Sequence, residues 1–323
     1  MATYALPVLY TLLLWWASTG VILYLDGLDR RTFIWSMAGA TVLLAVSLWG
    51  AAVTGAISTA KGAYLAFACG LTAWGWQLVS FYMGYLTGPR KTACEADLTG
   101  FRRFVEAVGT SLYHELAICL TALVLIALTW GQANQMSIWT FVVLWWMHQS
   151  AKLNVFFGVP NLGEELLPDH LRYLRSFMAR RPMNLLFPVS VTLSTIIAVL
   201  LVQRAAAQNA TPFEAAGFTM LATLMVLAIA EHWFLVVPMS ANALWQFGVK
   251  DSSAGRELED RKAFAEAEAP NDRIETVEEK ASAFATASAV GLDAWTHEDV
   301  GLSEPRGLRP ALESFGGGVS ASR

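Results

Sequence analysis

Residues 110–130 read TSLYHELAICLTALVLIALTW, a stretch that is almost entirely apolar after its first turn. A helix of about 20 apolar residues crosses the ~30 Å hydrocarbon core of a bilayer. Near its start stand His114 and Glu115, and ionisable side chains inside a membrane are costly enough to mark a site by default. The stretch therefore predicts a membrane-spanning helix with a functional polar site near its start.

Six other segments have the same length and character, which predicts an all-α polytopic membrane bundle of about seven transmembrane helices. The seven expected spans cover residues 4–25, 33–53, 63–86, 110–130, 136–157, 185–204 and 216–241. Only 15% of the 323 residues are charged and 55% are hydrophobic, whereas soluble domains carry roughly a quarter charged residues. This composition excludes a disordered chain, a disulfide-stapled secreted domain and a soluble nucleic-acid binder.

The charge divides the chain into two expected domains. Residues 1–250, the predicted seven-helix domain, hold 14 Lys and Arg against 11 Asp and Glu, which is a net charge of +3. Residues 251–323 hold the remaining 8 and 15, a net charge of −7, and have few large apolar side chains. Such a segment buries too little surface to offset the entropy of ordering it, so we expect an acidic, largely disordered tail.

Basic residues in the short loops set the expected orientation, because Lys and Arg collect on the cytoplasmic side of a membrane. The loops after the first, third, fifth and seventh spans hold eleven of them, and the opposite loops hold two, Lys61 and Arg204. The eleven are Arg30, Arg31, Arg90, Lys91, Arg102, Arg103, Arg172, Arg175, Arg180, Arg181 and Lys250. We expect a multi-pass inner-membrane protein with its N-terminus outside and its acidic tail in the cytoplasm.

Two cytoplasmic loops have helical patterns. Residues 95–108 and 168–179 each repeat apolar side chains at helical spacing between charged ones. Either segment could lie in the membrane interface or cover the end of the bundle, and the pattern leaves both open.

Three spans carry ionisable residues at similar depth. With a rise of ~1.5 Å per residue, His114, His148 and Glu231 lie roughly 9, 13 and 15 Å from the cytoplasmic ends of their spans. Shared depth predicts one pocket in the cytoplasmic half of the bundle. The candidate ligand-binding residues are His114, Glu115, His148, Lys152, Asn154, Glu164, Glu165, Glu231 and His232, and the candidate metal ligands among them are His114, His148, Glu231 and His232.

Three interpretations of this cluster remain open. The groups could bind a transition metal, provide an axial ligand to a tetrapyrrole metal, or pair with each other structurally; proton or solute transfer ranks below these. The sequence has no E-x-x-H pair of the helical di-metal proteins, no Walker A, no G-x-S-x-G and no dinucleotide fingerprint. No catalytic residue is therefore assigned.

Three stretches make the chain resemble a known family: SLYHELAI (111–118), WWMHQSAKLNVFFGVPNLGEELLPDHLRYLRSF (145–177) and RPMNLLFPVSVT (181–192). They resemble the PuhE family of photosynthetic complex assembly proteins, polytopic membrane proteins of anoxygenic phototrophic bacteria that are encoded beside reaction-centre and bacteriochlorophyll genes. The resemblance covers about residues 1–250 and leaves the tail outside.

The resemblance implies an intracytoplasmic or inner-membrane factor that assists assembly of the reaction centre or its light-harvesting complex. Its partners would be lipids and subunits of those complexes, and it would handle pigment; the resemblance names no cofactor, and the polar cluster leaves a bacteriochlorophyll or a transition metal open. A non-enzymatic role is the first hypothesis; a membrane metal-dependent oxidase or hydroxylase of pigment biosynthesis is the alternative, and a transporter comes last.

Overall fold

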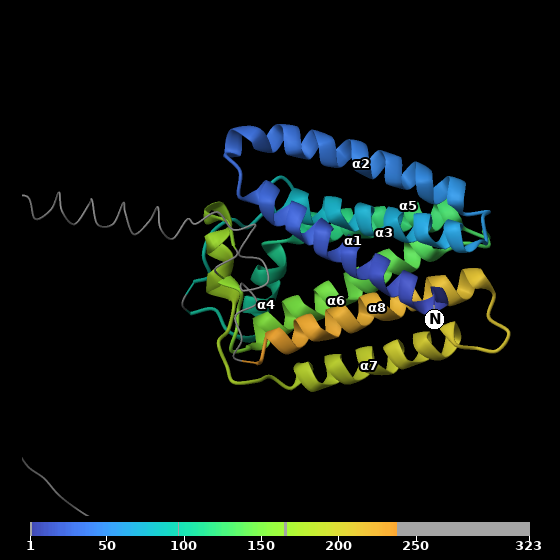
Figure 1. Ribbon diagram of the computed structural model, residues 1–323. Coiled ribbons are helices and arrows are strands. Elements are labelled where there is room, and N and C mark those ends of the chain that lie inside the picture. The colour runs from blue at the N-terminus through green and yellow to red at the C-terminus, as the bar shows by residue number, and fades with distance from the viewer. Residues whose placement is uncertain (1, 96, 165–166, 238–323) are drawn as a thin grey trace, which may run out of the picture. The chain divides into compact units, whose positions relative to one another are not determined.

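The computed structural model describes residues 2–95, 97–164 and 167–237, and over these residues the chain is helical with no strand (Figure 1). The predicted tail, residues 251–323, lies outside the described residues. The elements are α1 (Ala2–Asp26), η1 (Arg30–Thr32), α2 (Phe33–Thr54), α3 (Ala60–Tyr82), α4 (Gly100–Gly109), α5 (Leu112–Thr129), α6 (Met136–Phe157), η3 (Asp169–Phe177), α7 (Leu186–Ala205) and α8 (Pro212–Phe234).

Each predicted span coincides with one long helix, but the boundaries differ. The clearest shift is α8, expected at 216–241 and found at Pro212–Phe234. Thr211 and Glu214 form a capping box there, each side chain bonding the other's backbone, with Pro212 in the first turn. A capping box and a proline in the first turn both mark the start of a helix. They start α8 at Pro212, before residue 216, where hydropathy placed the start of the span.

Among the described residues, five helices are long and apolar enough to cross a membrane: α1, α2, α5, α7 and α8. The other two long helices, α3 and α6, have 23 and 22 residues but do not reach the same apolarity. The reason lies in their position, because α3 is packed against α1, α2, α5, α6 and α8. A helix enclosed by other helices can carry small and polar residues where a lipid-facing one cannot.

Small residues on α3 let the backbones of α3 and α6 approach closely. A Cβ atom at Gly70 would lie 2.3 Å from the backbone oxygen of Ser137 on α6. Ala63, Ala66 and Phe67 on the same helix are fully buried. The Gly62–Ala66–Gly70 stripe is therefore a packing surface, which is the usual role of such stripes.

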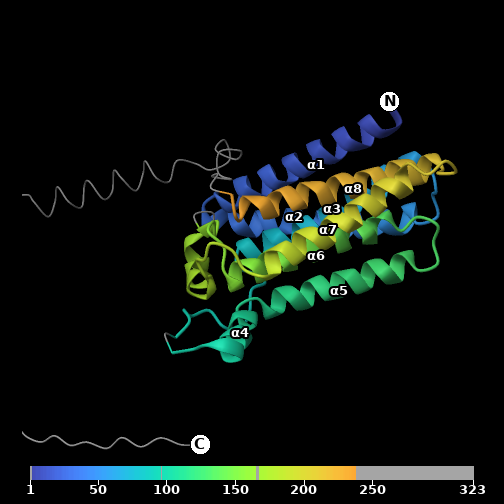
Figure 2. The ribbon, with the colours of Figure 1, turned by 90° about the horizontal axis from the view of Figure 1, so that it is seen from below.

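One end of the bundle is covered by α4 and η3, and we call it the α4/η3 end (Figures 1 and 2). The segment expected at 95–108 forms α4, and the one at 168–179 forms the 3-10 helix η3 directly after Pro168. The α1–α2 connection and the C-terminal ends of α3, α6 and α8 lie at the α4/η3 end, whereas the N-terminus of the chain lies at the other end of the bundle (Figure 1).

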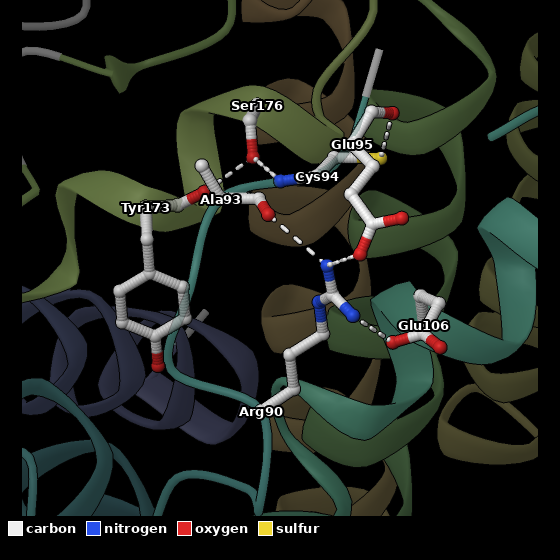
Figure 3. A network of polar contacts seen from close by, with 7 residues as sticks. All are labelled: Arg90, Ala93, Cys94, Glu95, Glu106, Tyr173 and Ser176. Atoms are coloured by element: carbon white, nitrogen blue, oxygen red, sulfur yellow. Dashed lines mark hydrogen bonds and ion pairs between the residues drawn. The ribbon is translucent and has the colours of Figure 1, made fainter. Parts of the chain in front are cut away.

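Polar contacts hold the segment between α3 and α4 against η3 (Figure 3). The guanidinium of Arg90 pairs with Glu106 of α4 at 2.5 Å and donates to the carbonyl of Ala93 at 3.1 Å. The amide of Cys94 donates to Ser176 of η3 at 2.7 Å. These contacts join the segment after α3 to both α4 and η3.

Candidate functional site

His114 lies in the first turn of α5, because α5 begins at Leu112. The sequence predicted a position about six residues inside the span. The amide of His114 donates to the carbonyl of Thr87 at 3.0 Å, so the segment after α3 is bonded to the start of α5. A Cβ at Gly88 would lie 2.1 Å from the carbonyl of Gly109, and only glycine permits this approach. The segment after α3 is thereby held against the start of α5, where Leu112 and Tyr113 are exposed and His114 is fully buried.

The structure brings His114 next to His148 of α6, and we call these two the imidazole pair. Their ring centroids are 5.8 Å apart. Aromatic rings flank them on both sides, with Phe81 4.7 Å from His114 and Trp74 5.3 Å from His148. Two imidazoles from separate helices thus meet in apolar, aromatic surroundings.

The nitrogens of His114 have no partner among the described residues. Neither Nδ1 nor Nε2 makes a hydrogen bond, and the same holds for Nε1 of Trp145, which is one turn before His148 on α6. A buried polar group left without a partner costs about 1–3 kcal/mol. Such groups in native proteins call for an explanation such as a water, an ion or a ligand, so the imidazole pair has the donor atoms of a binding site.

Glu115 and Lys152 pair with each other beside the imidazole pair. Lys152 Nζ forms an ion pair with Glu115 and donates to Ser111 at 2.9 Å, and Gln149 also donates to Glu115. Both charged side chains are partly exposed. The lysine and the carboxylate are therefore occupied by structural contacts between α5 and α6.

A second polar network lies on the opposite face of α6. Asn154 donates to the carbonyl of Ser150 at 2.9 Å and to Ser190 of α7 at 3.2 Å. His232 of α8 lies 2.8 Å from the carbonyl of Ala228 through Nδ1 and 2.9 Å from Ser150 Oγ through Nε2. A carbonyl only accepts, so in the neutral ring Nδ1 carries the proton and Nε2 accepts from the serine. Both nitrogens of His232 are used, and the network ties α6 to α7 and α8.

Glu231 points in another direction than His232, as adjacent helix positions lie about 100° apart. Its side chain makes a hydrogen bond with Trp15 of α1. The four candidate metal ligands thus occupy three places: the imidazole pair, the α6–α8 network and the α1 side of α8. Among the described residues, no group of three or more His, Cys, Asp and Glu side chains is arranged to hold a metal ion. The structure does not bring all four together.

The loop after α6 does not reach the imidazole pair. Glu164 accepts from Arg175 at 3.1 Å and from Arg180 at 3.2 Å, and the bond from Arg175 holds the pKa of that carboxyl below its usual range. Glu165 lies outside the described residues. Asn161, which the sequence pattern did not single out, donates to the carbonyls of Phe234 and Val237 at the end of α8. Glu164 and Asn161 therefore organise the α4/η3 end.

Several residues of the site escaped the sequence argument because they are uncharged. Ser111, Gln149 and Ser150 make polar contacts around α6, and Trp145 places an unpartnered Nε1 there. Gln149 lies three residues before Lys152 and Trp145 three before His148, while Ser111 lies three residues before His114 and Ser150 four before Asn154, which are helical neighbour distances. That spacing was the available signal.

The fold and site define a helical protein with several helices suited to a membrane and an imidazole pair in which His114 is buried and His148 half-buried. The chain belongs to the family described as "Protein of unknown function (DUF3623)", whose model matches residues 1–256. It is similar to a protein of Rhodobacter capsulatus named "Uncharacterized 30.4 kDa protein in puhA 5'region". The two are 37% identical over 246 residues, which are 74% of this chain and 89% of the relative. No solved structure matches the chain.

Proposed function

We propose that the protein is a membrane factor that assists assembly of a photosynthetic reaction centre or light-harvesting complex, as the resemblance to the PuhE family implies. Two findings support the proposal: the relative's name places it in the puhA 5′ region, and the chain has several helices suited to a membrane. The observation that carries the site is His114, fully buried with both ring nitrogens unpartnered beside His148. The imidazole pair is where such a factor would hold its ligand.

The donor set fits a metal that needs one or two protein ligands. The magnesium of a bacteriochlorophyll would need one donor from the protein, and the ring nitrogen of His114 or His148 would supply it. A transition-metal oxidase would need a larger ligand set, and the described residues provide no such group. His114 is closed off here, so a macrocycle would enter by outward movement of the first turn of α5.

We propose that all seven long helices cross the membrane, with the N-terminus outside and the α4/η3 end in the cytoplasm. At ~1.5 Å per residue, the 23 residues of α3 and the 22 of α6 extend about 33–35 Å, which is enough for the hydrocarbon core. The basic loop residues around Arg30, Arg90 and Arg175 all belong to connections at the α4/η3 end, in keeping with the positive-inside rule. Reporter fusions after α7 and α8 should give opposite signals; equal signals would overturn this topology.

The test of the ligand role is an absorption spectrum of the protein purified from pigment-synthesising cells. We expect pigment to co-purify with the wild type and to be lost from His114→Ala and His148→Ala. The matched control is His232→Ala, which removes a buried imidazole whose nitrogens are both hydrogen-bonded and should leave the pigment content unchanged. Pigment-free wild type, or equal loss from all three variants, would remove the ligand role.

The assembly role is tested separately by deleting the gene. An assembly factor should lower the level of assembled complexes while free pigment is still made. Accumulation of a defined pigment precursor would instead support the oxidase alternative, and elemental analysis of the purified protein would then have to find at least one metal per chain.

A further inference from the structure

The short helix α4 turns its apolar side chains outward. Phe101, Val105 and Val108 are 77%, 50% and 38% exposed, and their spacing of four and three residues places them on one face. A surface helix of a protein in water shows the reverse pattern, with its apolar face on the core. Something other than water therefore covers this face.

The charged side chains of α4 that face the protein are paired there. The guanidinium of Arg103 lies 5.1 Å from the ring centre of Phe156 and donates to the carbonyl of Phe177 at 2.9 Å. Glu106 pairs with Arg90 at 2.5 Å. Because these groups have partners within the chain, α4 is held in this orientation and its outward face is fixed.

The outward face of α4 is continuous with a lipid-facing helix. On α5, Leu116, Leu120 and Leu123 form an exposed apolar row, and α5 is one of the helices suited to cross a membrane. Only Thr110 and Ser111 separate α4 from α5. In Figure 1 α4 is set across the direction of the long helices, and in Figure 2 it lies beside the start of α5. The apolar face of α4 therefore lies at the start of a helix that is suited to cross a membrane.

We infer that α4 is an interfacial helix, whose Phe101–Val105–Val108 face is embedded among the lipid chains of the leaflet at the α4/η3 end. The occupant is lipid, since the face continues the apolar row of α5, and the exposed Arg102 beside it suits anionic headgroups. This inference does not depend on the assembly role. The sequence left two roles open for this segment, and under this inference α4 fills both, because it covers the end of the bundle with one face and contacts lipid with the other.

The membrane contact of α4 bears on the site, because α4 leads directly into the first turn of α5. That turn carries Ser111, which accepts from Lys152, and His114. Two connecting residues, Thr110 and Ser111, therefore separate the proposed membrane contact from the start of the helix that carries His114.

Spin labels in lipid nanodiscs test the inference on the full chain. Single cysteines replace Phe101, Val105 and Val108 in a background that lacks the three native cysteines, and Arg102→Cys is the matched control on the same helix. We expect collisions with oxygen to dominate at the three apolar positions and collisions with a water-soluble nickel complex to dominate at Arg102→Cys. High nickel access at all four positions, or immobilised labels shielded from both reagents as in contact with a protein, would overturn the inference.

A second measurement uses the unaltered protein. Lipids that carry a photoreactive group in the acyl chain should form adducts within residues 100–109 after irradiation, as detected by mass spectrometry of the digested chain. Adducts on α5 without any on α4 would refute an embedded α4, whatever the behaviour of the labelled variants.

Discussion

Gly70→Ala should separate α3 from α6, and Gly75→Ala, one and a half turns further along the same helix, is its matched control. A Cβ at position 70 would lie 2.3 Å from the carbonyl oxygen of Ser137 and 2.9 Å from Cβ of Thr140, whereas one at position 75 would meet nothing within 4 Å. An ordinary contact needs at least 3.4 Å, so α6 must withdraw by about 1 Å at this point, as overpacked sites do.

The expected difference follows from two opposing terms. Replacing glycine by alanine inside a helix gains about 1 kcal/mol, and this term applies to both variants. Overpacking against a backbone costs about 1–3 kcal/mol and applies only at position 70. We therefore expect Gly75→Ala to be neutral or stabilising and Gly70→Ala to be less stable than it by about 1–3 kcal/mol.

Unfolding by SDS in mixed micelles, followed by tryptophan fluorescence, measures both variants against the wild type. The chain's 13 tryptophans give a strong signal. If Gly70→Ala is as stable as Gly75→Ala, the close approach of α3 and α6 is wrong, and the placement of His148 that depends on it is wrong as well.

Three further predictions concern the polar contacts. Lys152→Met should destabilise the protein by about 1–3 kcal/mol, because the partly buried Glu115 loses its counter-charge. The double variant with Glu115→Gln should recover part of that stability in the same SDS titration. No recovery would contradict the pairing. Asn161→Ala should loosen the end of α8, which proteolysis near residue 237 would detect as faster cleavage, while an unchanged rate would argue against the two carbonyl contacts. Burial lowers the pKa of His170 below its usual 6.5, so the unfolded chain takes up the proton first and stability should fall as pH drops below 6.5 towards the folded pKa. His170→Gln should flatten this part of the stability–pH curve, and an identical curve would refute the contribution of this residue.

The helices were largely predictable because membrane helices need long apolar runs. Hydropathy placed all seven long helices, including α3 and α6, which are less apolar than the other five. It misplaced the start of α8, where the Thr211–Glu214 capping box acts through hydrogen bonds that hydropathy does not register. It also placed His114 too deep along its helix, because α5 begins only at Leu112, and hydropathy does not register the contact of Gly88 with Gly109 just before it.

The sequence predicted which ionisable side chains belong to the site, because burying them in a membrane costs free energy. It did not predict how these side chains lie relative to one another. The cost of placing an ionisable side chain inside a membrane singled out His114 and His148, whose rings do lie next to each other. It also singled out Glu231 and His232, which face different neighbours because the rotation of a helix about its axis is set by packing. Asn161 lies in a loop of ordinary turn composition, and its role appears only when the end of α8 is placed beside it.

The two polar networks on opposite faces of α6 restrict how this protein can move. Turning α6 about its axis would break the bonds of Ser150 and Asn154 on one side and those of Gln149 and Lys152 on the other. These bonds therefore hold α6 in one rotation about its own axis. Opening a path to His114 by moving α5 would therefore require breaking the contacts of Lys152 and Gln149 with Glu115.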